Sequence, residues 1–225
     1  MPSKNSVKEY VTTGYYHIYN RGVEKRLIFQ DQQDYGVFLS YLKTYLLPAN
    51  KDLLMEQLGN QSTSPYEKDR IRKLLRLNNF ATDIILVAYC LMPNHFHILI
   101  KQNNQSAIDP FMNSLGTRYT MYFNSKYKRV GPLYQDVYKA VLVKTDEQLL
   151  HLSRYIHKQA LILQGDALQN QPSSYPEYCG LRNTTWIHPE EILNFFPKTQ
   201  HKSYIQFMAL EEIPQITSNL IIEDD

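Results

Sequence analysis

Two histidines spaced for one face of a β-strand are the first residues in this sequence that could do chemistry. His95 and His97 follow a tight turn at residues 92–94 and precede the apolar residues 98–100. Strand side chains alternate faces, so both imidazoles project from one face while Phe96 points to the other. Such a pair can bind a metal, but two strand histidines can equally be hydrogen-bonded residues of a sheet surface. A metal site needs a third ligand from elsewhere in the chain.

A second candidate pair lies on a helix expected over residues 146–163. Tyr155 and Gln159 are four residues apart, and hence one turn apart on the same helix face. They lie beside an apolar stripe that contains Leu152 and Ile156. If this helix packs beside the histidine strand, both side chains point toward the histidine pair. The simpler alternative for Tyr155 is an aromatic residue at the edge of the core, since the chain contains 18 tyrosines.

The elements that must position these residues follow the order strand, helix, strand, strand, helix, strand. Hydrophobic periodicity, capping residues and turn residues indicate them. The order is that of an α+β fold, the ferredoxin-like split βαβ sandwich: an antiparallel sheet with two helices on one face and the other face free for a ligand. The predicted ranges are 15–22, 31–47, 81–91, 95–102, 107–126 and 133–143.

We expect the chain to have two parts. Residues 1–165 would form the main domain, with a polar helical insertion at about 49–79. Residues 166–225 would form a mostly helical C-terminal extension that ends in a frayed polar tail. Short helices are predicted there over 189–196 and 199–210.

Composition excludes several classes of protein. The chain of 225 residues has only two cysteines, Cys90 and Cys179, without Cys-x-x-Cys spacing, which excludes a disulfide framework and a thiolate zinc site. The polar N-terminus does not resemble a signal peptide, and no apolar run approaches about 18 residues. We therefore expect a cytoplasmic protein without a membrane partner. The net charge of +2 does not by itself indicate a nucleic-acid partner.

Basic residues nevertheless gather near the end of the second helix and on the strand that follows. A charge run of this kind is often only a solvated helix face, and the competing interpretation is contact with phosphate groups. The group consists of Arg118, Lys126, Lys128, Arg129 and Lys139.

Four short motifs occur in a fixed order along the chain. They read Tyr-Asn-Arg-Gly at 19–22, Met-Pro-Asn-His-Phe-His at 92–97, Gly-Pro-Leu-Tyr-Gln at 131–135 and Arg-Tyr-Ile-His at 154–157. Together they resemble the single-tyrosine HUH transposases of insertion sequences, especially the branch associated with repetitive extragenic palindromes. That branch usually has Asn-Pro where this chain has Gln159-Ala160, whereas Gln is a metal ligand in other insertion-sequence members.

The resemblance implies the same sandwich fold, a divalent metal bound by His95, His97 and Gln159, and Tyr155 as the nucleophile. Nitrogen and oxygen ligands together favour Mg²⁺ or Mn²⁺. A tyrosine nucleophile retains the energy of a cleaved phosphodiester in a phosphotyrosine, which a free 3′ hydroxyl can reverse. The predicted function is a transposase that cleaves and rejoins single-stranded DNA beside a hairpin. A water-using phosphodiesterase would need an extra carboxylate near the histidines, and none is obvious.

The alternative function is a domesticated module that binds hairpin DNA without transposition. The presence of both histidines, Gln159 and Tyr155 favours the enzyme. We expect a monomer, because the C-terminal extension with Trp186 could hold the tyrosine helix in place; a homodimer that exchanges this helix is the alternative. The predicted DNA contacts are Arg21, Arg118, Lys126, Lys128, Arg129, Lys139, Arg154 and Lys158.

Overall fold

The computed structural model describes residues 8–162, 171–197 and 199–210. Within these residues, one antiparallel sheet has the spatial order β2-β3-β1-β4. Helices α1 (Gln32–Leu46) and α4 (Ile108–Lys126) are the two crossovers. This order and these crossovers confirm the predicted ferredoxin-like α+β fold. The strands are β1 (Tyr15–Arg21), β2 (Ile84–Met92), β3 (His95–Gln102) and β4 (Lys139–Val143), and a 3-10 turn, η1 (Val23–Lys25), follows β1.

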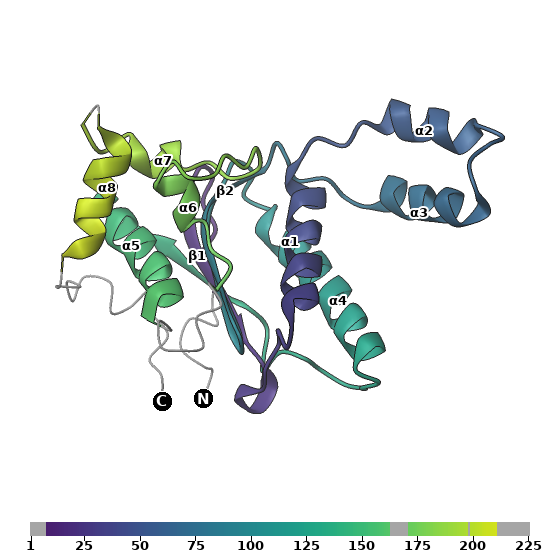
Figure 1. The fold of residues 1–225 in the computed structure, drawn as a ribbon, viewed down its shortest axis with the longest axis horizontal. Coiled ribbons are helices and arrows are strands. Elements are labelled where there is room, and N and C mark those ends of the chain that lie inside the picture. The colour runs from purple at the N-terminus through teal and green to yellow at the C-terminus, as the bar shows by residue number, and fades with distance from the viewer. Residues whose placement is uncertain (1–7, 163–170, 198, 211–225) are drawn as a thin grey trace.

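One face of the sheet packs against α1 and α4 (Figure 1). Strand alternation sends Ile18 and Phe96 to this side, where Phe96 meets Phe38 of α1 at a ring-centroid distance of 5.5 Å. Tyr119 of α4 packs on the same phenylalanine and donates a hydrogen bond to the carbonyl oxygen of Ile28 (2.6 Å). The main core therefore holds β1 and β3 in place from the sheet face opposite the histidines.

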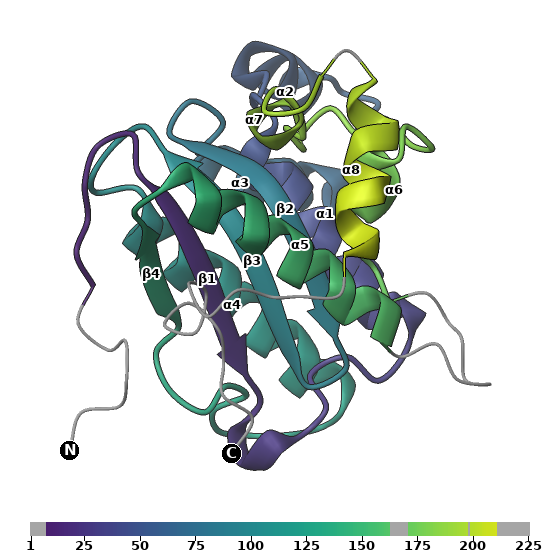
Figure 2. The same cartoon turned by 90° about the vertical axis from the view of Figure 1, so that its left-hand side faces the viewer.

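The opposite face of the sheet is covered, and the prediction that it is free was wrong. Helix α5 (Asp146–Ile162) lies across the strands there (Figure 2), and its Leu152 and Ile156 share a second buried cluster with Leu99 of β3. This helix was predicted from its apolar stripe, which requires a partner. The sheet supplies that partner, so the histidine face and the tyrosine helix form one interface.

The C-terminal segment holds α5 from its outer side. Short helices α6 (Tyr175–Tyr178) and α7 (Glu190–Leu193) precede α8 (Gln200–Ala209), and α7 and α8 both contact α5. The segment also pairs with β2, where the amide of Leu91 donates to the carbonyl of Pro172 (2.9 Å). Trp186 stacks on Tyr89 with ring centroids 6.3 Å apart. The predicted helices at 189–196 and 199–210 thus correspond to α7 and α8.

The insertion forms two helices, α2 (Lys51–Gly59) and α3 (Pro65–Arg76), which pack together and project from the α1–α4 layer away from the sheet (Figure 1). We call this pair the arm. Helix α3 begins where the side chain of Ser64 accepts from the amide of Glu67, with Pro65 in the first turn. The predicted helical insertion is therefore present.

The start of β4 differs from the sequence prediction. Strand β4 begins at Lys139 rather than 133, because residues 133–138 run as a loop beside α4. The predicted domain boundary at 165 and the predicted frayed end lie outside the described residues. Among the described helices, none combines the length and the apolar character needed to cross a membrane.

Candidate active site

The histidine pair lies on β3 and faces α5. His97 is 0 % exposed and His95 is half-buried. Their ring centroids are 4.9 Å apart, and the rings are nearly perpendicular, at 87°. The side-chain oxygen of Asn94, in the turn between β2 and β3, lies 2.6 Å from Nδ1 of His95. The alternation of the strand therefore brings the two imidazoles together as predicted.

A third histidine, which the sequence analysis did not select, stands beside this pair. His17 of β1 is 0 % exposed, and its Nε2 lies 2.9 Å from Nδ1 of His97. This contact uses one ring nitrogen of His97, so the other, Nε2, remains. The only sequence signal for His17 is its place in a strand of alternating residues; its contact with His97 follows from the antiparallel pairing of β1 with β3.

Nε2 of His97 is buried and has no hydrogen-bond partner among the described residues. A buried polar atom without a partner costs about 1–3 kcal/mol, so its retention needs an explanation. Metal-binding histidines commonly use one ring nitrogen for the metal and the other for a hydrogen bond that fixes the ring. In His97, the contact of Nδ1 with His17 supplies the hydrogen bond that fixes the ring, and Nε2 is left for a metal.

Helix α5 places Tyr155 over the histidines. The Tyr155 ring lies 5.4 Å from the His97 ring and 6.4 Å from the His17 ring, measured between centroids, and both pairs meet edge to face. Tyr155 is 8 % exposed. Gln159 follows one turn further along α5, and its side chain is half-buried. The predicted packing of the tyrosine helix beside the histidine strand is therefore found.

The local environment keeps His97 neutral. Burial, followed by the nearby His17 and His95, holds the pKa of His97 well below its usual value. Neutral imidazole is the form that ligates metals. In the described part of the chain, no three His, Cys, Asp or Glu side chains form a metal cluster. The predicted donor set needs only two of these side chains, because its third member is the amide of Gln159.

The predicted DNA contacts do not form one surface. Lys126 bonds to Asp31 and to the fully buried Asp34, each at 2.7 Å. Burial lowers the pKa of Lys126, but the hydrogen bonds to these carboxylates raise it overall. Arg118 instead stacks its guanidinium 4.0 Å from the ring centroid of Tyr41. Of these two basic residues of α4, Lys126 is therefore used in ion pairs within the protein, and Arg118 packs against α1.

Arg154 is the clearest departure from the predicted surface. It is 1 % exposed, and its guanidinium lies 4.9 Å from the ring centroid of Phe207 on α8. Because α8 covers it, Arg154 is not presented to DNA, and we leave it out of the proposed contacts. Lys158 likewise donates to the carbonyl of Leu210 (2.6 Å).

The remaining basic residues lie nearer the sheet and loop surfaces. Arg21 donates to Gln135 (2.5 Å), and Lys139 pairs with Asp136 (3.1 Å). Arg129 donates to Asn124 (2.7 Å), while the neighbouring Lys128 is exposed. The roles of these four residues in DNA contact stay predictions.

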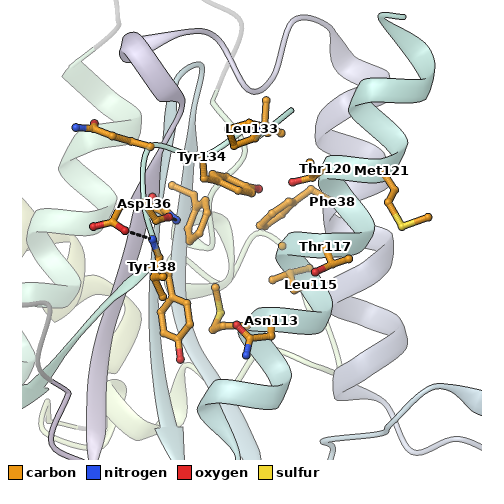
Figure 3. A pocket seen from close by; sticks show the side chains of 17 residues that line it. Phe38, Asn113, Leu115, Thr117, Thr120, Met121, Leu133, Tyr134, Asp136 and Tyr138 are labelled. Carbon is orange, nitrogen blue, oxygen red and sulfur yellow. Dashed lines mark hydrogen bonds between the residues drawn. The ribbon is translucent and has the colours of Figure 1, made fainter. Parts of the chain in front are cut away.

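A cavity of about 500 Å³ lies between α4 and the 132–138 loop, away from the histidine face (Figure 3). Its lining is mainly apolar and includes Phe38 and Leu115. Tyr134 lies across it with its hydroxyl toward α4, and that hydroxyl has no hydrogen-bond partner among the described residues. Residues 133–138 do not extend β4, because Leu133 and Tyr138 are buried in the core cluster that includes residues of α4.

Residues 61–159, somewhat under half of the chain, match the sequence model of the family described as "Transposase IS200 like". This stretch includes β2, β3, α4, β4 and most of α5, and therefore both motif histidines, Tyr155 and Gln159. No curated protein sequence matches the chain.

Two solved structures are similar in outline. A REP-associated tyrosine transposase bound to a REP hairpin has 9% identity and a TM-score of 0.40, over 82% of this chain and 96% of that one. A candidate transposase from Deinococcus radiodurans has 16% identity and a TM-score of 0.33, over 71% of this chain and 98% of that one. At such TM-scores these likenesses carry no part of the argument. The match over residues 61–159 does, and it shows that the segment holding the site is similar in sequence to the IS200-like transposases.

Proposed function

We propose that this protein cleaves and rejoins single-stranded DNA beside a hairpin, through a covalent phosphotyrosine at Tyr155. One observation carries the proposal: the Tyr155 ring lies 5.4 Å from that of His97, whose buried Nε2 has no hydrogen-bond partner among the described residues. A nucleophile and an open ligand nitrogen therefore share one interface. The family match over the same residues supports this assignment.

In this mechanism each side chain has a distinct task. His95, His97 and Gln159 would hold a divalent ion, Mg²⁺ or Mn²⁺, which supplies Lewis-acid polarisation of a phosphate oxygen when bound. His17 keeps His97 in the required tautomer through its 2.9 Å contact with Nδ1. The buried strand β3 limits movement of both histidines.

The covalent step takes place at Tyr155. Its phenolic oxygen gives up its proton and attacks phosphorus, the bond from phosphorus to the 3′ oxygen breaks, and that oxygen takes up a proton and leaves as a 3′ hydroxyl. The downstream strand stays attached to the protein through its 5′ phosphate. Attack by another 3′ hydroxyl on this phosphotyrosine reverses the step and joins the DNA. The packing of Tyr155 between α5 and the sheet fixes the direction from which it can approach the phosphate.

The second candidate function, a hairpin-binding module without cleavage, predicts the same DNA affinity but no adduct. The open Nε2 of His97 favours the enzyme, because a protein that only binds DNA has no use for an unpartnered buried imidazole nitrogen.

We further propose that the protein acts as a monomer. Helices α7 and α8 contact α5 within the same chain, and Tyr204 of α8 lies 2.7 Å from Nδ1 of His157 on α5. These contacts support a tyrosine helix that completes its own site. Light scattering at low protein concentration should give a single chain mass, and twice that mass would contradict the proposal.

A DNA hairpin carrying a 3′ label tests the cleavage proposal, since the label stays on the strand that joins the protein. With Mg²⁺ or Mn²⁺, a denaturing gel should show labelled protein. Tyr155→Phe should abolish this band and leave hairpin affinity unchanged. The matched control is Tyr66→Phe, because Tyr66 lies on the arm and is 78 % exposed. An adduct in Tyr155→Phe would show that another tyrosine is the nucleophile.

A further inference from the structure

Helix α3 of the arm is strongly basic on its outer face. Its inner face is apolar: Ile71 is 4 % exposed, and Leu74 and Leu75 are half-buried. The acidic residues Glu67 and Asp69 are outnumbered by basic ones. Those basic residues are Lys68, Arg70, Arg72, Lys73 and Arg76.

Four of the cations of this region line a single cavity of about 400 Å³ between α3 and α4, which we call the arm cleft. Arg70, Lys73 and Arg76 come from α3 and Arg118 from α4. The other lining residues are leucines, and no acidic side chain lines the cleft within the described residues. Arg70, Lys73 and Arg76 are exposed to water, and like charges gathered in one cleft repel one another and attract anions. An anionic ligand would relieve this repulsion.

The arginines of the cleft have few partners of their own. Arg118 is held by stacking on Tyr41 and Tyr45, and its Nη1 is buried without a hydrogen-bond partner among the described residues. Within the same residues, Arg70 and Arg76 form no ion pair, whereas Lys73 bonds to Asp69 at 2.7 Å. Guanidinium groups suit phosphate because their planar donors can bind two oxygens at once.

We propose that the arm cleft binds the phosphate backbone of DNA that flanks the hairpin, an inference that rests on the proposed function. Arg70 and Arg76 are six residues apart on α3, which corresponds to about 9 Å along the helix axis. A strand of duplex carries a phosphate about every 3.4 Å of rise, so the cleft spans about two or three phosphates. This extent fits a polymer better than a single free anion.

The bound segment differs from the one at Tyr155. The arm projects from the α1–α4 layer, and α5 lies on the other side of the sheet (Figure 1). The α1–α4 layer, from which the arm projects, lies two layer spacings of about 10 Å from α5, so DNA must extend by at least about 20 Å, or six base pairs, to reach from one position to the other. The arm cleft should therefore act only on substrates with flanking DNA.

Two oligonucleotides and two double variants test this inference by fluorescence anisotropy at several salt concentrations. One oligonucleotide is the bare hairpin, and the other carries about 20 base pairs of flanking duplex. The test variant is Arg70→Gln with Arg76→Gln. The control variant, Lys68→Gln with Arg72→Gln, removes the same charge from the same helix but from residues that do not line the cleft.

For the flanked hairpin, the test variant should raise Kd about ten-fold and reduce the salt slope by about 2, while the control should change Kd less than about two-fold. For the bare hairpin, Kd and adduct yield should match the wild type. Equal losses in both variants, equal losses on both oligonucleotides, or no loss at all would overturn the inference. If the wild type forms no adduct, the proposed function fails, yet the comparison of salt slopes still decides on the arm cleft.

Discussion

Two buried histidines of this protein, His97 on β3 and His157 on α5, are both 0 % exposed but differ in their contacts. Nδ1 of His157 lies 2.7 Å from the hydroxyl of Tyr204, and its Nε2 lies 2.8 Å from Oγ of Ser174. His97 has such a contact only at Nδ1, from His17. Within the described residues, both ring nitrogens of His157 therefore have a hydrogen-bond partner, whereas Nε2 of His97 has none.

This difference distinguishes a buried histidine that stabilises the fold from one that is available to bind a ligand. The His157 region joins α5, α8 and the segment beside β2, and each ring nitrogen ties a different element. Both ring nitrogens of His157 are therefore used in contacts within the protein. The His97 region holds one nitrogen open next to Tyr155, which is useful only if something else binds there. Both residues belong to a family-like motif, so the motifs alone do not reveal which histidine is structural.

The largest expected effect is that of His97→Gln on adduct formation. We predict a fall of more than about 100-fold, since this change removes a proposed metal ligand, and mutation of groups that only support a ligand costs 10–100-fold. Thermal unfolding should change less than in His157→Gln, because His97 has a hydrogen-bond contact only at Nδ1, whereas both ring nitrogens of His157 have one. The measurement is single-turnover adduct yield against metal concentration, and full activity at ordinary metal concentration would refute the assignment.

His17→Gln should lower the rate of adduct formation by about 10-fold to 100-fold, because the contact that fixes the His97 ring is lost while the ligand itself remains. Isothermal titration with Mn²⁺ should show weaker binding by a similar factor. Unaltered metal affinity would mean that His17 serves only to fill the sheet interface.

Gln159→Ala should have a smaller effect, about ten-fold or less, because water can replace a neutral amide oxygen. Excess Mn²⁺ should restore most of the rate in this variant and little of it in His97→Gln. Equal behaviour of the two variants under excess metal would remove Gln159 from the proposed ligand set.

His157→Gln should have the smallest effect on adduct yield per folded molecule. Its cost should appear in stability, at about 1–3 kcal/mol, because Ser174 and Tyr204 each lose one of their hydrogen bonds and keep another. Urea unfolding measures this loss. Reduced activity in protein shown to be fully folded would contradict the structural role.

The same residue gives a pH prediction. Burial lowers the pKa of His157 to about 3, so below about pH 6.5 the unfolded chain takes up a proton that the folded chain does not. Stability should therefore be constant with respect to this group above pH 6.5 and decrease as the pH falls toward 3. Urea midpoints in wild type should fall more steeply over this range than in His157→Gln; identical slopes would rule this out.

Much of the fold could be predicted because strand alternation and helix periodicity are local. The histidine spacing placed His95 and His97 on one face, and the apolar stripe of α5 placed Tyr155 beside them. The contact with His17 could not be predicted in this way, since it depends on how β1 pairs with β3. Long-range register is not visible in a single run of residues.

The errors have related causes. Arg154 looked like a surface cation, but α8, which lies about fifty residues later, covers it. The second sheet face was expected to be free for a ligand because both helices of the predicted split βαβ order cover the other face. Residues 133–138 alternate like a strand, yet they pack against α4. In each case a contact between residues far apart in the sequence determined the structure, and the local sequence pattern did not contain that contact.

The account rests on Tyr155 as the residue that becomes attached to DNA, and peptide mapping of the adduct tests this most directly. Trypsin cleaves after Arg154 and Lys158, so the peptide from Tyr155 to Lys158 should carry the oligonucleotide and be identifiable by mass spectrometry. We predict that all oligonucleotide-linked peptide is this one. Attachment at a tyrosine outside α5, with the peptide from Tyr155 to Lys158 unmodified, would contradict the central claim.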